Sequence, residues 1–227
     1  MALIAIENAQ ISYEGVTAVR DATFSVEKGD YLVIIGENGS GKSSVMKAML
    51  GLVKLKSGAI RYGDGLRKDQ IGYLPQQTQV QRDFPASVEE VVRSGLVSRA
   101  GGRFFLSRAL RARAFENMEL IGISSLRKKP YRALSGGQQQ RALLARAMCA
   151  TDSILLLDEP VTGLDPQAAE EMYDIIKALN DRGVAVATIS HDVKGALRDA
   201  KHVLVMNNTV GRYLTIAEYE RWRMEND

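Results

Sequence analysis

The residues with the clearest chemistry form a glycine-rich run that could bind phosphate: Gly36, Glu37, Asn38, Gly39, Ser40, Gly41, Lys42, Ser43 and Ser44. Glycines let backbone N–H groups converge on phosphate oxygens, and a helix that begins at the end of the run adds a favourable dipole. Lys42 would neutralise the terminal phosphates, and the Ser43 hydroxyl would ligate Mg²⁺. The apolar stretch Tyr31–Ile35 supplies the preceding strand that this motif requires. The alternative is a glycine-rich turn that precedes Lys-Ser by chance.

Two adjacent carboxylates follow a second apolar stretch, Ile154–Leu157. Asp158 and Glu159 would therefore lie at the carboxyl end of a buried strand, where ligands bind in open α/β sheets. Asp158 would hold Mg²⁺ through water, and Glu159 would polarise an attacking water as general base. Taken alone, the pair is more simply an acidic strand end before Pro160, but the phosphate-binding run favours the metal and base roles.

A third run, Leu134-Ser135-Gly136-Gly137-Gln138, opens a predicted helix that extends to about Ala150. Ser135 and Gln138 have the spacing of a capping box, in which each satisfies a backbone N–H of the other. Two glycines in the first turn cost ~1 kcal/mol each relative to alanine. Their presence indicates that another group approaches this backbone closely, and a helix N-terminus attracts phosphate. The capping role and the phosphate role are compatible.

In the chain, Leu134–Gln138 lies between the phosphate-binding run and the carboxylate pair. In that order the three motifs resemble those of ATP-binding-cassette (ABC) ATPases, and the resemblance covers nearly the whole chain. It implies an enzyme that hydrolyses ATP with Mg²⁺ as a sandwich dimer. Each nucleotide would lie between the phosphate loop of one copy and Ser135–Gln138 of the other, with Ser135 and Gly137 on the γ-phosphate. Nucleotide binding would close the dimer, and hydrolysis would reopen it.

The resemblance also assigns roles to two isolated residues. His191 follows the apolar stretch Val184–Ile189 and matches the family's switch histidine, which senses the γ-phosphate. A lone histidine is otherwise more often an ordinary surface or core residue. Gln76 matches the glutamine loop, which contacts Mg²⁺ and the attacking water, although its neighbour Gln77 fits the same position.

Three more residues have competing interpretations. Tyr13 matches the aromatic side chain that stacks on adenine in this family, and it also fits an ordinary exposed strand tyrosine. Asp165 matches the family's dimer-contacting loop, and it also fits a helix N-cap before Pro166. His202 matches no motif, so we assign it no chemical role.

The elements that position these residues alternate between strand and helix. Predicted strands and helices outside the runs above are Leu3–Ile6, Ala9–Tyr13, Ala22–Val26, a helix from about Lys42 to Leu50, a helix over Pro166–Asn180, and His202–Met206. Helical spacing dominates residues 78–150. We predict an α/β fold: a P-loop NTPase core of residues 1–77 and 151–227, with a mostly parallel sheet and an antiparallel N-terminal β subdomain, and an inserted helical subdomain over residues 78–150.

Composition limits the setting in which the protein works. With 45% hydrophobic and 25% charged residues, the chain is typical of soluble globular proteins. No apolar stretch approaches the ~20 residues of a membrane helix, the N-terminus lacks the basic start of a secretory signal, and a single cysteine, Cys149, fits a reducing cytosol. We therefore expect a peripheral protein at the cytoplasmic face of the membrane. A net charge of +3 is too small to imply nucleic acid as a partner.

Basic residues are concentrated between Arg99 and Arg132. This stretch contains nine Lys or Arg residues and only two acidic residues, Glu116 and Glu119. A solvated helical surface is the simpler interpretation. The alternative is a face near anionic lipid headgroups or an acidic loop of a partner.

The resemblance implies three partners: a second copy of the chain, an integral membrane permease and an extracytoplasmic substrate-binding protein. The segment Asp83–Val88 (DFPASV) is similar to one in ATPases of zinc and manganese importers, so a divalent metal ion is the predicted cargo. The same segment fits a helix start, with Pro85 at its opening and Ser87 near the cap.

Two other functional classes are alternatives. A non-transport ABC protein usually fuses two cassettes or adds coiled coils, and this chain has one cassette with neither. A P-loop kinase would not need the LSGGQ run.

Overall fold

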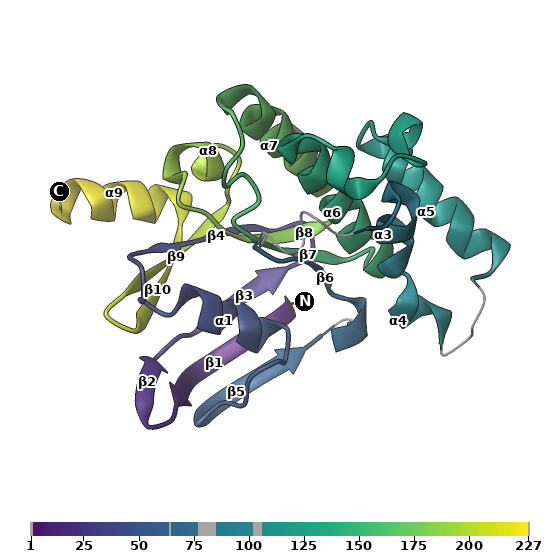
Figure 1. Cartoon of the computed structure of the whole chain (residues 1–227). Coiled ribbons are helices and arrows are strands. Elements are labelled where there is room, and N and C mark those ends of the chain that lie inside the picture. The colour runs from purple at the N-terminus through teal and green to yellow at the C-terminus, as the bar shows by residue number, and fades with distance from the viewer. Residues whose placement is uncertain (1, 64, 77–84, 102–105, 227) are drawn as a thin grey trace.

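The computed structural model describes residues 2–63, 65–76, 85–101 and 106–226. Within these residues the chain forms two sheets, a four-stranded antiparallel sheet and a six-stranded core sheet, together with the helices that cover them. In Figure 1 the antiparallel sheet is the lower layer, the core sheet lies across the middle, and most helices form the upper layer.

The core sheet has the order β10-β9-β4-β8-β7-β6. Its strands are β4 (Tyr31–Gly36), β6 (Gly72–Leu74), β7 (Ile154–Asp158), β8 (Ala185–Ile189), β9 (His202–Asn207) and β10 (Val210–Thr215). All neighbours pair in parallel except β10, which runs antiparallel to β9 at one edge. The carboxyl ends of β4 and β7, which carry the phosphate loop and the paired carboxylates, therefore point to the same edge of the sheet.

The antiparallel sheet comprises β1 (Ala2–Tyr13), β2 (Val16–Val19), β3 (Phe24–Glu27) and β5 (Ser57–Tyr62), with the other three strands all paired to β1. The sequence predicted two strands where the structure has β1. The break in the pattern reflects an irregularity, since Asn8 has a φ of 47° and the register with β5 shifts between Glu7 and Gln10. The prediction for β3 began two residues too early.

Helices lie on both faces of the core sheet. They are α1 (Lys42–Met49), α3 (Val88–Ser94), α4 (Val97–Ala100), α5 (Arg108–Leu120), α6 (Gly136–Ala150), α7 (Pro166–Asp181), α8 (Val193–Leu197) and α9 (Ile216–Asn226), with single 3₁₀ turns at Lys68–Gln70, Ser124–Leu126 and Tyr131–Ala133. Helices α3 to α6 lie between β6 and β7 in the chain, at the right of Figure 1. The boundary of a helical subdomain at residues 78 and 150 stays a prediction.

Alternate residues of the core-sheet strands pack into two apolar clusters. Tyr31, Val33 and Ile35 of β4 face a cluster that includes α3, α5, α6 and α7. Leu32 and Ile34 face the other cluster, which contains α1 and the inward side of the antiparallel sheet. Because consecutive strand residues point to opposite faces, α1 and α6 lie on opposite sides of the core sheet. None of the helices in the described residues is long and apolar enough to cross a membrane.

Candidate nucleotide site

The phosphate loop joins β4 to α1, and two of its glycines leave no room for a side chain. Gly36 and Gly41 have φ values of 147° and 104°. A Cβ at Gly36 would lie 2.2 Å from the carbonyl oxygen of Met206, and one at Gly41 would lie 2.4 Å from that of Ala18. The loop is therefore pressed against β9 and β2, while Glu37 to Gly39 are exposed. An exposed, glycine-rich backbone of this kind is suited to binding phosphate groups.

Lys42, the first residue of α1, lies against the loop that precedes it. Its Nζ donates to the carbonyl oxygens of Gly36 and Glu37, both at 2.8 Å, and the residue is only 7% exposed. Burial lowers the pKa of Lys42, and the carboxylates of Glu159 and Asp158 oppose that shift. Ser40, in the same loop, is also buried, and its Oγ has no hydrogen-bond partner among the described residues. Buried polar atoms normally have a partner, so the loop has hydrogen-bonding capacity left for a ligand.

Asp158 ends β7 beside the phosphate loop. Burial raises the pKa of Asp158, and the neighbouring charge of Glu159 raises it further. The hydroxyl of Tyr73, on β6, lies 3.5 Å from Asp158 Oδ2, and burial followed by this carboxylate raises the pKa of Tyr73 to about 12. Tyr73 also packs against the apolar cluster that contains α1, the helix that begins at Lys42. The sequence motifs gave no indication of this tyrosine.

Glu159 receives three side chains on its carboxylate. His191 Nε2 lies 3.0 Å from Oε1, while Gln76 Nε2 and Thr162 Oγ1 donate to Oε2 at 2.9 and 3.0 Å. The side chain of Glu159 is only 11% exposed. The structure therefore brings together three residues that the sequence placed far apart: Gln76, Glu159 and His191. It adds Thr162, which the sequence analysis missed; Gln77 lies outside the described residues.

The Ser135–Gln138 run forms the N-terminus of α6 as a capping box. Ser135 Oγ accepts from the backbone N–H of Gln138 at 3.3 Å, and Gln138 Oε1 accepts from the backbone N–H of Ser135 at 3.2 Å. A Cβ at Gly137 would lie 3.3 Å from the Cβ of Ala168 in α7, so this glycine permits close packing within the chain. Ser135 and Gly136 are exposed. The run and the phosphate loop belong to helices on opposite faces of the core sheet.

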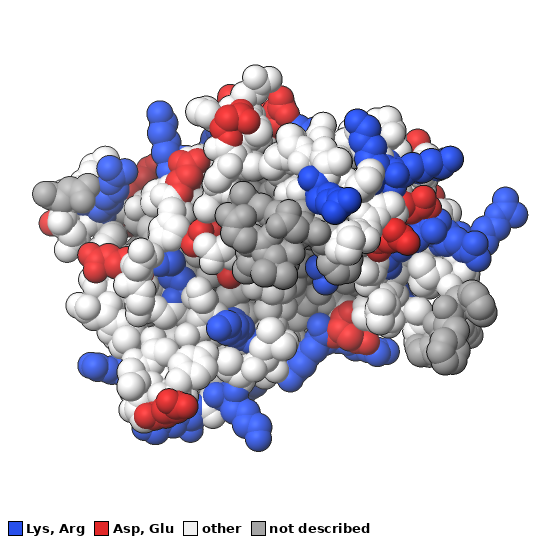
Figure 2. Space-filling view, viewed as in Figure 1, with Lys and Arg blue, Asp and Glu red and all other residues white. Residues whose placement is uncertain are grey.

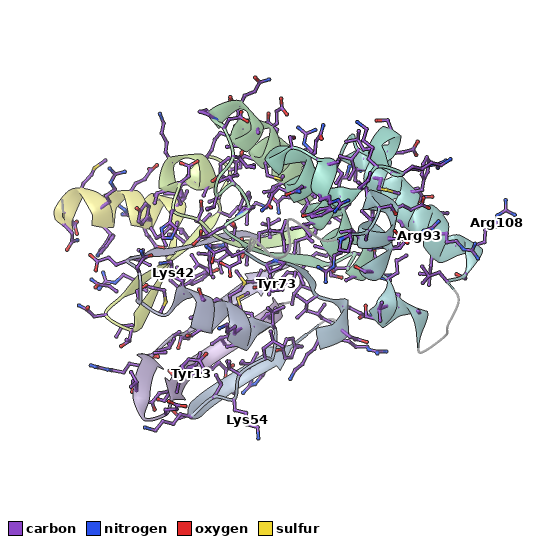
Figure 3. The ribbon with its side chains drawn as sticks, in the orientation of Figure 1. Tyr13, Lys42, Lys54, Tyr73, Arg93 and Arg108 are labelled. Atoms are coloured by element: carbon purple, nitrogen blue, oxygen red, sulfur yellow. The ribbon has the colours of Figure 1, made fainter. Side chains whose placement is uncertain are left out.

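Tyr13 and Asp165 stand at the ends of other elements. Tyr13 ends β1, is 42% exposed, and lies on the antiparallel sheet below Lys42 in Figure 3. Asp165 is the N-cap of α7, with Oδ1 accepting from the backbone N–H of Ala168 at 3.0 Å and Pro166 as the first helical residue. The N-cap interpretation of Asp165 is therefore confirmed.

His202, which matched no motif, has a structural environment at the other end of the core sheet. Its Nδ1 lies 2.7 Å from Oδ1 of the buried Asp30, and its ring stacks on Tyr213 with 5.0 Å between centroids. These contacts connect β9 and β10 to the turn before β4. They explain the histidine without any role at the nucleotide site.

The basic run is partly neutralised within the chain. Arg99 and Arg113 both pair with Asp152, and the Arg127 guanidinium lies 5.4 Å from the centroid of the Phe115 ring. Figure 2 shows blue side chains over the helical region at the right, with red ones among them. The described part of the run is therefore a mixed surface in this view, not a field of one sign.

A phosphate loop after a parallel strand, with two carboxylates at the end of another, defines a nucleoside-triphosphatase of the P-loop class. A family model described as ABC transporter matches residues 19–162, which is more than half of the chain. The chain therefore belongs to the ABC transporter family, as an ATP-binding cassette that hydrolyses ATP.

Curated relatives cover most of the chain. It is 33% identical over 213 residues to the chelated iron transport system membrane protein YfeB of Yersinia pestis, covering 91% of this chain and 72% of that protein. It is 32% identical to the manganese transport system ATP-binding protein MntA of Synechocystis sp. (strain ATCC 27184 / PCC 6803 / Kazusa), covering 91% and 82%. The zinc import ATP-binding protein ZnuC of Hydrogenovibrio crunogenus (strain DSM 25203 / XCL-2) is 32% identical, covering 90% and 79%.

Solved structures share the fold. A nucleotide-free ATP-binding cassette from an ABC transporter superposes with a TM-score of 0.84 at 24% identity, covering 100% of this chain and 96% of that one. The dimeric structure of MJ0796, a bacterial ABC transporter cassette, superposes with a TM-score of 0.76 at 25% identity, covering 94% and 98%. The predicted P-loop NTPase fold with its antiparallel strands is therefore confirmed.

Proposed function

We propose that this chain energises the import of a divalent metal ion, zinc or manganese, through a separate membrane permease. The proposal that the chain hydrolyses ATP at this site depends mainly on the cluster at Glu159. There Gln76 and His191 lie within hydrogen-bond distance of a carboxylate beside the phosphate loop. A largely enclosed carboxylate at this place suits a general base for an attacking water. Loop residues Gly36 to Ser44 hold the ATP phosphates, and Tyr13 stacks on adenine.

Mg²⁺ fits the donors at this site. Ser43, Asp158 and Gln76 offer hydroxyl, carboxylate and amide oxygens, which are the hard ligands that Mg²⁺ takes, usually with water and substrate phosphates. When bound, Mg²⁺ would supply charge neutralisation at the phosphates. Lys42 stabilises the same phosphates by its ammonium, while Glu159 holds the water in line and accepts its proton. His191 orients Glu159 and the γ-phosphate.

A second copy of the chain is the partner that the signature run requires. Ser135–Gln138 opens α6 on one face of the core sheet, whereas the phosphate loop leads into α1 on the other. The exposed Ser135 and Gly136 are thus available to a nucleotide held by another molecule. The dimeric cassette MJ0796, at 25% identity, supports this arrangement. Asp165, between the base and α7, would then lie near the dimer contact.

The permease docks in a groove of about 320 Å³ in the helical region. It is lined by Ala86, Glu90, Val91, Ser94, Tyr131, Leu143 and Arg146. The groove is mainly apolar, and one acidic and one basic side chain also line it. Such a lining suits a short amphipathic segment of a membrane protein. Docking there would hold the chain at the cytoplasmic face of the membrane, with a substrate-binding protein delivering the ion outside.

Two observations support the assignment of a metal ion as the cargo. Relatives named for manganese, zinc and chelated iron transport are 32–33% identical over about nine-tenths of the chain. The DFPASV segment leads into α3, although Asp83 and Phe84 lie outside the described residues. Ser87 is the N-cap of α3 and forms a capping box with Glu90, so the helix-start interpretation of this segment is confirmed. The metal interpretation rests on the relatives and the motif together.

Glu159→Gln tests the mechanism. The amide keeps the shape of the side chain and loses the base, so we expect normal ATP binding, very slow turnover, and a dimer that accumulates with ATP. Glu170→Gln, an exposed site on α7, is the matched control and should behave as the parent. Size-exclusion chromatography with and without ATP, together with phosphate release, gives both readouts. Parental turnover by Glu159→Gln, or a monomer in saturating ATP, would refute the sandwich mechanism.

A further inference from the structure

Of the three side chains that contact the Glu159 carboxylate, one belongs to the same turn as Glu159 itself. Thr162 Oγ1 donates to Oε2 at 3.0 Å. Gln76 and His191 reach the carboxylate from distant parts of the chain, after β6 and after β8. Their positions depend on how those segments are placed, whereas the position of Thr162 depends on the turn alone.

The turn that carries Thr162 is fixed by its backbone. Glu159 has a φ of 54°, and its N–H donates to the carbonyl oxygen of Ile189 at 2.9 Å. The N–H of Thr162 donates to the carbonyl oxygen of Glu159 at 3.3 Å, and Val161 between them is buried. A left-handed backbone at a non-glycine residue is uncommon and persists where the surroundings hold it. The hydroxyl of Thr162, itself exposed, is therefore presented to the carboxylate by a rigid frame.

We propose that Thr162 is a positioning residue for Glu159, an inference that rests on the proposed role of Glu159 as general base. Its hydroxyl selects the side-chain rotamer in which the carboxylate faces the phosphate loop. A hydrogen bond to a charged acceptor is stronger than one between neutral groups, so it narrows the rotamers of a flexible glutamate. Since Thr162 is outside the residues that we assign to the nucleotide and to Mg²⁺, its loss should slow turnover without weakening ATP binding.

Two substitutions at this position separate the hydroxyl from the shape of the side chain. Thr162→Val keeps the branched shape and removes the donor; we expect kcat to fall about tenfold, the effect of losing one charge-assisted hydrogen bond of about 1.4 kcal/mol, with KM for ATP unchanged. Thr162→Ser keeps the donor and should retain kcat within about twofold. Thr215→Val is the matched control, because Thr215 Oγ1 also donates to a glutamate three residues on, Glu218 Oε2, at 2.8 Å, on a different element.

Steady-state ATP hydrolysis and thermal melts of the purified variants test the positioning role of Thr162. Support requires a fall in kcat for Thr162→Val alone, with parental KM and melting temperature. Parental kcat in Thr162→Val overturns the inference, and so does an equal loss in Thr162→Ser or a raised KM. Glu159→Gln in the same assay keeps the two proposals apart. If it still turns over ATP, the role of the base fails; if it is inactive while Thr162→Val is normal, only the role of Thr162 fails.

Discussion

At the scale of single residues, the nucleotide site places like charges together in a partly buried space. Burial raises the pKa of Asp158, and the charge of Glu159 raises it further. The folded protein therefore binds a proton on Asp158 more tightly than the unfolded chain does. By linkage, the ionised carboxylate lowers the free energy of unfolding as pH rises through and above the usual carboxyl range. This residue is retained at a cost in stability, as expected of a functional group.

Asp158→Asn should therefore stabilise the nucleotide-free protein while abolishing its turnover. We expect a gain of about 1 kcal/mol at neutral pH, about 2–4 °C in Tm for a chain of this size. The gain should shrink as pH falls through the raised pKa of Asp158 and should be lost below the usual carboxyl range, where the folded and the unfolded parent both bind the proton. Thermal melts in a metal chelator from acidic to neutral pH measure it.

Asp152→Asn is the control, because we expect it to change stability at neutral pH in the opposite direction. Burial opposes the ionisation of Asp152, but hydrogen bonds from Arg99 and Arg113 hold the pKa of its carboxyl below the usual range. The stability that Asp152 contributes is present above that range and is lost as pH falls through the lowered pKa, so its amide variant should be less stable at neutral pH. An Asp158→Asn protein that melts at or below the parental temperature at neutral pH would contradict the linkage argument.

At the residue scale, the sequence could predict side chains that belong to contiguous motifs. Gly36, Lys42 and Asp158 stand together because a strand ends beside each motif, and runs such as Tyr31–Ile35 mark those strands. Thr162 and the Tyr73 hydroxyl could not be predicted in the same way. Their part in the site depends on a turn geometry and on the pairing of β6 with β7, and a threonine or tyrosine in isolation indicates neither.

At the scale of elements, the longer strands that are buried on both faces were the predictable ones. Strands β4, β7 and β8 are covered on both faces, so they appear as unbroken apolar runs. Strands β5 and β10 lie at sheet edges and are largely half-buried or exposed, and the sequence analysis missed both. Helix α9 was missed because Tyr219 is its one buried residue in the described chain, which leaves little apolar periodicity.

The N-terminus of α6 combines a structural and a chemical role that substitution can separate. Ser135→Ala removes the cap and should cost about 1 kcal/mol of stability. Ser135→Asp keeps a good N-cap residue, so its melting temperature should stay near the parental value. Its added negative charge would repel a phosphate held by a second copy, so ATP-dependent dimerisation should be lost. The test is size-exclusion chromatography of each variant in the Glu159→Gln background.

Ser87→Ala supplies the matched control, because Ser87 caps α3 with the same capping box and lies away from the phosphate loop. It should lose stability as Ser135→Ala does and still form the ATP-bound dimer. If Ser135→Asp dimerises as readily as the parent, the γ-phosphate role of this run is wrong, and the residues of the run are explained by capping and by packing against Ala168 alone.

At the scale of the whole molecule, the proposed cargo would be determined by the permease to which this chain binds. The groove beside α3 and the Pro85–Ser87 entry to that helix belong to the helical region, on the face of the core sheet opposite α1. The proposed nucleotide site and the proposed docking groove therefore use different parts of the chain, which the core sheet and α6 connect. A change that stops hydrolysis should abolish uptake while leaving docking intact.

We predict that deleting the gene lowers uptake of zinc or manganese and raises the cell's requirement for that metal. Complementation with Glu159→Gln should not restore uptake, because the ATPase stays closed, whereas Glu170→Gln should restore it fully. Uptake of radiolabelled zinc and manganese, with total cellular metal as a second readout, measures the effect. Unchanged accumulation of both metals, together with lost uptake of an organic solute or new sensitivity to a toxic compound, would show that the cargo is wrong while the ATPase mechanism stands.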